Sequence, residues 1–159
     1  MVREDFAIRA LGGRGIDLVL SNAAFEHFDD VDDVIRQLGA VVVPGGALVS
    51  EVDLQTHTRW IRDADPLNIY RYAEPLYGAF RFRGSPNRVR PDAYRTALER
   101  HGWADIRGTP VVALDPDYVR QVQPTLAGSF REAPDMDVLR IMLCARRARP
   151  EPARAAPQT

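Results

Sequence analysis

The sequence contains no lysine, one cysteine and no long apolar run, and each of these absences excludes a class of protein. All 21 basic residues are arginine, scattered along a chain of 159 residues whose net charge is −1. A near-neutral chain gives no electrostatic reason to expect nucleic-acid binding. Cys144 alone cannot form an internal disulfide, which suits a reducing cytoplasm. No stretch approaches the roughly 20 apolar residues of a membrane span. We therefore expect a cytoplasmic, single-domain protein that binds neither nucleic acid nor membrane.

The most informative stretch is residues 17–27, which read D-L-V-L-S-N-A-A-F-E-H. Residues 16–20 form a short apolar run whose length suits a strand buried on both faces of a parallel sheet. In open α/β sheets, ligands bind beyond the carboxyl ends of the strands. Ser21, Asn22 and His27 fall in that position. We therefore expect these residues to line a binding site.

A helix and a second strand are predicted next. Apolar residues at helical spacing predict a helix over residues 29–42. Pro-Gly-Gly at residues 44–46 is expected to end the helix and turn the chain into a buried strand at residues 47–52. Four acids at the helix start have two readings, as helix caps or as metal ligands: Asp29, Asp30, Asp32 and Asp33. Capping explains most of them, so no metal site is predicted.

Together these segments resemble the second half of a class I S-adenosylmethionine-dependent methyltransferase, of the methyltransferase type 11 kind. In that family, (F/I)-D-(L/V)-V-x-S-x-x-x-x-E-H forms the fourth strand and its loop, and a P-G-G turn leads into the fifth strand. The resemblance covers residues 4–147. It implies a partial Rossmann-like α/β fold: strands 4-5-7-6 of a seven-stranded sheet, with the last strand antiparallel. It also implies S-adenosylmethionine as the cofactor and a small molecule as the methyl acceptor.

Cofactor contacts are predicted for Asp5, Phe6, Ser21 and Asn22. Asp5 lies twelve positions before Asp17, where the family places an acid that accepts a hydrogen bond from the adenine amino group. The next residue, Phe6, would offer its backbone N–H to a ring nitrogen. A solvated N-terminal acid is the alternative for Asp5. The family's glycine-rich loop and ribose-binding acid have no counterpart in this sequence.

The candidate catalytic residues are His27, His57 and Asp53, with Glu26 and Glu51 beside them at the expected strand ends. Methyl transfer depends mainly on alignment of the nucleophile, the methyl carbon and the leaving sulfur. A base helps where the acceptor carries a proton. The alternative for His27 is a structural role, in which its side chain stabilises the loop that contains it.

Two further motifs resemble a subset of the family that carries D-x-x-x-H and N-R-L-R. They are D-L-Q-T-H at residues 53–57 and N-R-V-R at residues 87–90. Arg88 and Arg90 in the second motif either bind an anionic acceptor or are structural charges. His101, at the end of a predicted helix, is read as a surface residue.

The expected domain organisation follows the resemblance. Residues 1–147 would be the C-terminal portion of a methyltransferase domain, and residues 148–159 a disordered tail. The aromatic-rich residues 58–90 would be an insertion that covers the acceptor, although core packing also explains aromatic residues. Further elements are predicted at residues 91–101 (helix), 103–107 (strand), 115–130 (helical excursion) and 138–145 (strand).

The absent first half has physical consequences. The strand at residues 16–20 would become a sheet edge with unpaired backbone groups. Each large apolar side chain left uncovered forfeits roughly 1.5–3 kcal/mol, against a total margin of about 5–15 kcal/mol. We therefore expect a truncated or fragmentary enzyme that is inactive alone and that forms a homodimer or needs its N-terminal half. The alternative is a non-catalytic remnant or subunit that completes its sheet with a partner chain.

Overall fold

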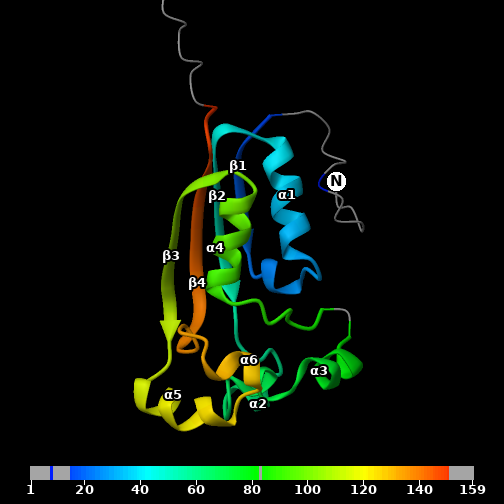
Figure 1. Ribbon diagram of the computed structural model, residues 1–159, viewed down its shortest axis with the longest axis vertical. Helices are drawn as coiled ribbons and strands as arrows, with labels where there is room; N and C mark the ends of the chain where they lie inside the picture. The colour runs from blue at the N-terminus through cyan, green and yellow to red at the C-terminus, as the bar shows by residue number, and fades with distance from the viewer. Residues whose placement is uncertain (1–7, 9–14, 83, 151–159) are drawn as a thin grey trace, which may run out of the picture.

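Four strands form one sheet in the computed structural model, which describes residues 8, 15–82 and 84–150 (Figure 1). The strands are β1 (Ile16–Asn22), β2 (Val42–Asp53), β3 (Trp103–Ala113) and β4 (Val138–Arg147). They lie in the order β1-β2-β4-β3, with β1 parallel to β2 and the other pairs antiparallel. The predicted α/β class and the antiparallel last strand are confirmed. The place of these strands within a seven-stranded sheet stays a prediction.

Two helices, α1 (Val31–Val41) and α4 (Pro91–Arg100), cover one face of the sheet (Figure 1). Ile35 of α1 and Leu98 of α4 are fully buried with Leu48 of β2 in the same core cluster. Both helices were predicted from their apolar spacing. The Asp30 side chain accepts a hydrogen bond of 2.9 Å from the Asp33 backbone N–H, so it caps α1.

The Pro-Gly-Gly segment follows the end of α1, as predicted, but it belongs to β2 instead of preceding the strand. Helix α1 ends at Val41, and residues 44–46 already belong to β2. The pairing of β1 with β2 is irregular here, because Ile16 lies opposite Val42 and Leu18 lies opposite Ala47. Gly45 has a φ of +87°, which favours glycine. The segment is therefore a bulge within the parallel pair.

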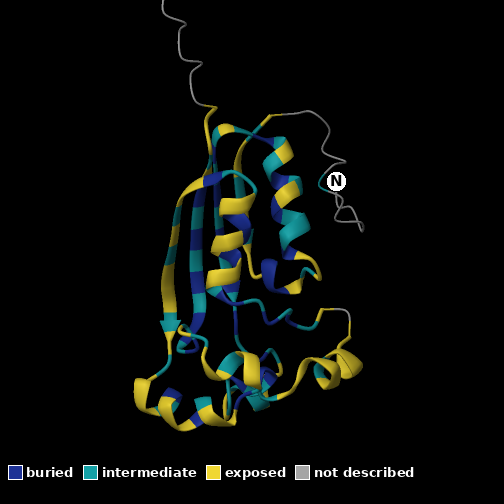
Figure 2. Cartoon of the chain, viewed as in Figure 1, coloured by how far each residue is buried: buried dark blue, intermediate teal, exposed yellow. Residues whose placement is uncertain are grey.

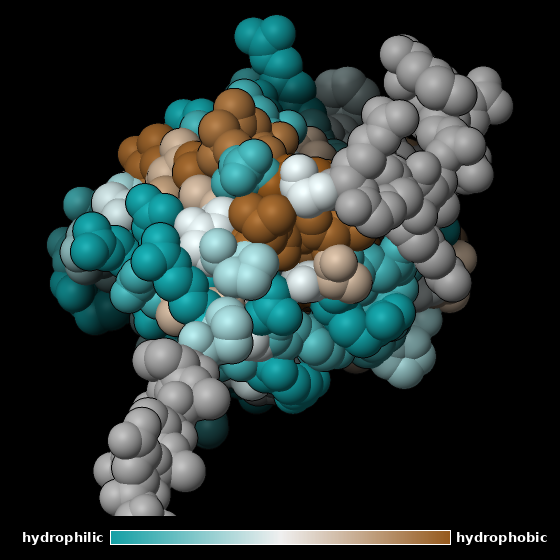
Figure 3. Space-filling model, turned by 90° about the horizontal axis from the view of Figure 1, so that it is seen from above, coloured by the Kyte–Doolittle hydropathy of each residue, from teal (hydrophilic) through white to brown (hydrophobic). Residues whose placement is uncertain are grey.

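One face of β1 is open in the described part of the chain. Leu18 and Leu20 are 51% and 71% exposed, and they share this face with Ala47 and Val49 of β2. Burial of β1 on both faces is therefore wrong, and its expected position at the sheet edge is confirmed. On β4, by contrast, buried and partly buried residues alternate (Figure 2). Seen from above, hydrophobic side chains gather in the middle and along one flank of the molecule (Figure 3).

A layer of short helices lies beyond the carboxyl ends of β1 and β2 (Figure 1). It has its own core cluster, which includes Tyr70, Leu126 and Met136. No helix in the described ranges is long and apolar enough to cross a membrane. The layer consists of α2 (Arg59–Arg62), η3 (Asn68–Arg71), α3 (Glu74–Phe80), α5 (Pro116–Val122), η4 (Gln123–Thr125) and α6 (Gly128–Arg131).

Asp65 joins the parts of this layer, and we expect Asp65→Asn to destabilise the protein by about 1–2 kcal/mol at pH 7. The carboxylate accepts hydrogen bonds from Arg71 at 2.6 Å, Asn68 at 3.3 Å and the Tyr118 hydroxyl at 3.1 Å. Burial alone would raise the pKa of Asp65, but these bonds outweigh it and lower the pKa. The stabilisation is therefore present at neutral pH and is lost as the pH falls below about 4.

Urea denaturation of both proteins at pH 7 and pH 3 checks this expectation. The difference between wild type and Asp65→Asn should shrink at pH 3, where the Asp65 carboxyl group of the unfolded chain takes up a proton. A difference that stays constant between the two pH values would contradict the assigned role.

Candidate functional site

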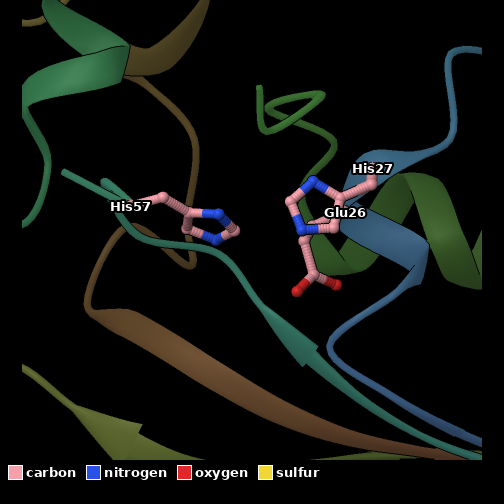
Figure 4. A group of neighbouring side chains, drawn as sticks. All are labelled: Glu26, His27 and His57. Atoms are coloured by element: carbon pink, nitrogen blue, oxygen red, sulfur yellow. The ribbon is translucent and has the colours of Figure 1, made fainter. Parts of the chain in front are cut away.

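Three titratable side chains meet where β1 and β2 end. Glu26 and His27 belong to η2 (Phe25–His27), which follows β1, and His57 lies in the loop after β2. The two imidazole rings lie edge to face with centroids 4.9 Å apart, and the Glu26 carboxylate lies close to them (Figure 4). One ligand-type atom from each residue lies within 4.8 Å of the others. The structure thus brings together two predicted catalytic residues and their neighbour Glu26.

Glu26 is the buried member of this cluster. Its side chain is only 1% exposed, and neither carboxylate oxygen has a hydrogen-bond partner among the described residues. Burial raises the pKa of Glu26 because it disfavours the charged form. Nearby backbone N–H groups and His27 oppose this rise, whereas the negative charge of Asp53 adds to it. The carboxyl group therefore holds its charge less readily than an exposed one.

His57 is the third member of the cluster, and Asp53 of the D-x-x-x-H motif lies beside it. His57 Nε2 lies 3.8 Å from Asp53 Oδ2, at the outer limit of an ion pair. Burial lowers the pKa of His57, and the Asp53 carboxylate only partly opposes this effect. His57 is therefore predominantly neutral at pH 7, and a neutral imidazole can accept a proton or bind a metal.

Asn87 holds the Glu26–His27 loop in place. Its side-chain amide donates to the backbone carbonyls of Phe25 at 2.8 Å and Phe28 at 3.0 Å. Its backbone N–H donates to the Glu26 carbonyl at 2.6 Å. This positioning role was missed in the sequence, where the only signal was that Asn87 begins the N-R-V-R motif.

The two arginines of that motif are structural charges. Arg88 is buried and donates to the carbonyls of Ile69 at 3.0 Å and Tyr72 at 2.7 Å. Its guanidinium also stacks on the Tyr77 ring, 4.0 Å from the centroid. Arg90 is likewise buried and hydrogen-bonded inside the protein. These contacts use the guanidinium groups to tie the helical layer together, so the reading as anion-binding residues is wrong.

An apolar hollow of about 450 Å³ begins at His57. Its walls come from the predicted insertion at residues 58–90, together with Thr56 and His57. Several wall residues are exposed aromatic or aliphatic side chains, so the aromatic residues here are not all core. The wall includes Ile61, Tyr72, Leu76, Tyr77, Phe80 and Phe82.

The predicted cofactor residues are placed only in part. Ser21 and Asn22 end β1 and lie opposite Ser50 and Glu51 of β2. They are therefore at the same end of the sheet as the cluster. Asp5 and Phe6 lie outside the described residues.

His101, the third histidine, lies elsewhere. Its Nε2 is 2.8 Å from the Asp32 carboxylate, which also accepts a hydrogen bond from Arg100 at 2.8 Å. The bond with His101 is the main reason why the pKa of Asp32 is lowered. His101 therefore joins α4 to α1, and the site is limited to the other two histidines.

No protein-family model and no curated protein sequence matches this chain. Solved structures do match at low identity. A chain in the complex between the Haloferax volcanii Trm112 methyltransferase activator and a methyltransferase is 14% identical, with a TM-score of 0.50 over 86% of this chain and 56% of that one. An S-adenosylmethionine-dependent methyltransferase from Mesorhizobium loti is 17% identical, with a TM-score of 0.49 over 85% and 63%.

A third match is phosphoethanolamine N-methyltransferase 2 from Haemonchus contortus, solved with S-adenosyl-L-methionine. It is 11% identical, with a TM-score of 0.49 over 84% of this chain and 33% of that one. This chain thus spans less than two thirds of the length of each of these proteins. At such identities the likeness concerns the fold alone. The chain has a mixed α/β fold similar to that of class I methyltransferases.

Proposed function

We propose that this chain is the acceptor-binding part of an S-adenosylmethionine-dependent methyltransferase that acts on a small molecule. The observation that carries the proposal is the position of His57 in the wall of an apolar hollow, with His27 and Asp53 next to His57. His27 follows β1, Asp53 ends the parallel neighbour β2 and His57 follows β2, and ligands of open α/β sheets bind at such strand ends. The methyltransferase-like fold and the sequence resemblance support the choice of reaction.

The proposed cofactor position is over the end of β1, near Ser21 and Asn22. The acceptor would lie in the hollow beside His57. Its nucleophilic atom would form a bond to the methyl carbon while the carbon–sulfur bond breaks and leaves its electron pair on sulfur. His57, His27 or Asp53 would take up the proton released by the acceptor. The apolar walls favour an acceptor with an aromatic or aliphatic body.

Calorimetric titration with S-adenosylmethionine tests the proposal. We expect no saturable binding by the 159-residue chain, because the sequence lacks the glycine-rich loop. We expect micromolar binding once an in-frame upstream segment that encodes a strand and a D/E-x-G-x-G-like loop is joined to it. The 159-residue chain is the matched control for the extended one.

The other outcomes are equally informative. Micromolar binding by the 159-residue chain alone would overturn the view that it needs a further part. A stop codon directly upstream, with no binding, would favour a second function, namely a non-catalytic subunit. The open β1 face and edge favour that alternative, because they offer a surface on which another chain can complete the sheet.

A further inference from the structure

We propose that Glu26, His27 and His57 bind a single divalent transition-metal ion of the zinc type. Two imidazoles and a carboxylate are donors that Zn²⁺ uses in proteins. Their ligand atoms already lie within 4.8 Å of one another. Glu26 and His27 are neighbours in η2, whereas His57 comes from the loop after β2. The metal would therefore join two segments whose side chains lie near one another (Figure 4).

The geometry needs only a small adjustment. With bonds of about 2.0–2.1 Å, tetrahedral zinc holds its ligands about 3.3 Å apart. Each side chain would therefore move by about an ångström. The rings of His27 and His57 already lie edge to face at 71°, with no side chain described between them. Rotation about the side-chain bonds of exposed His27 and half-buried His57 supplies this movement.

The buried Glu26 carboxylate is the independent observation that points to a cation. It is 1% exposed, and neither oxygen has a hydrogen-bond partner of good geometry among the described residues, although the backbone N–H groups of Glu26 and Asp53 lie close enough to favour its charge. A buried carboxylate without a partner is costly unless it is paired or coordinates a metal. His57 Nε2 is also buried without a hydrogen-bond partner in the same region. A metal between these atoms would satisfy both.

Three protein ligands leave one coordination position open, which is typical of a catalytic zinc site. The exposed His27 leaves this position accessible, and the hollow begins at His57. With both imidazoles bound to metal, Asp53 would remain as a proton acceptor at the site. The proposal goes beyond methyl transfer, because its test measures bound metal and needs no cofactor or acceptor.

The test titrates the whole 159-residue chain with ZnCl₂ and measures retained zinc by mass spectrometry after dialysis. We expect one zinc per chain, and an affinity that falls at least about tenfold in Glu26→Gln and in His57→Gln. His101→Gln and Cys144→Ser are the matched controls, because they remove the remaining histidine and the only thiol. Both should bind within about twofold of wild type.

Thermal melting separates lost ligation from lost folding. Glu26→Gln removes a buried charge without changing the shape, so in EDTA it should melt no lower than wild type. Added ZnCl₂ should raise the melting temperature of wild type and leave that of Glu26→Gln unchanged. Co²⁺ bound in place of zinc should give visible absorption bands with the intensity that is typical of tetrahedral coordination. Wild type that retains no zinc, or Glu26→Gln that binds it as well as wild type, would overturn the proposal.

Discussion

Replacing Arg90 by methionine is expected to lower the free energy of unfolding by about 3–5 kcal/mol. Arg90 is 7% exposed, and its guanidinium donates to the Tyr70 hydroxyl at 3.2 Å and the Val138 carbonyl at 3.0 Å. It also lies 3.4 Å from the Asp135 carboxylate. Methionine fills most of the volume of the arginine side chain but cannot donate a hydrogen bond. The substitution would therefore leave a carboxylate and a carbonyl buried without their partner.

Arg100→Met is the matched control, because it removes the same charge near the other end of α4. Arg100 pairs with Asp32 at 2.8 Å, but its side chain is 61% exposed. An exposed ion pair contributes about 0–1 kcal/mol. Urea denaturation of both variants measures the difference. Equal losses in the two variants would show that the buried contacts of Arg90 do not stabilise the fold.

Leu48→Ala is expected to lower the free energy of unfolding by about 2–5 kcal/mol, because it opens a cavity in the main core. Leu48 is fully buried on the face of β2 that α1 and α4 cover. Leu20→Ala removes the same atoms from the neighbouring strand. Because Leu20 is 71% exposed on the open face of β1, it should cost at most about 0.5 kcal/mol.

Denaturation at several protein concentrations turns this pair into a test of association. If the open face is exposed in solution, the losses in free energy of unfolding measured for Leu48→Ala and Leu20→Ala are both independent of protein concentration. A large loss in Leu20→Ala that shrinks as the protein is diluted would show that a second copy covers this face, because association stabilises the fold more at higher concentration. That outcome would support the predicted homodimer and contradict an uncovered face.

The spacing of apolar residues along the chain predicted the helices, because their buried residues recur at helical intervals. Ile35 and Leu38 in α1, and Tyr94 and Leu98 in α4, face the core because helical spacing places them on one side. The segment at Pro44 was predicted less completely, because it is an irregular part of β2 and not a separate turn. Proline and glycine indicate irregular backbone, but whether it becomes a turn or a bulge depends on the strand alongside.

The contacts of the N-R-V-R motif could not be predicted from the sequence. Its residue types left two readings open, an anion site or structural charges, since exposed arginines commonly bind carboxylates and phosphates. The structure turns Arg88 inward, onto the carbonyls of Ile69 and Tyr72. Asn87 meanwhile supports the loop that carries Glu26. No local pattern encodes these contacts, because the partners lie at least sixteen positions away in the chain.

The sequence by itself determined the α/β class, the parallel β1–β2 unit and the position of His27 and His57 beyond two strand ends. The helices follow from the local spacing of apolar residues, whereas the pairing of β1 with β2 and the place of the histidines were implied by the family resemblance. Only the tertiary structure decided that β1 has an open face and that Glu26 is buried beside both imidazoles. Such features depend on which distant segments pack together, and burial without a partner is a property of that packing.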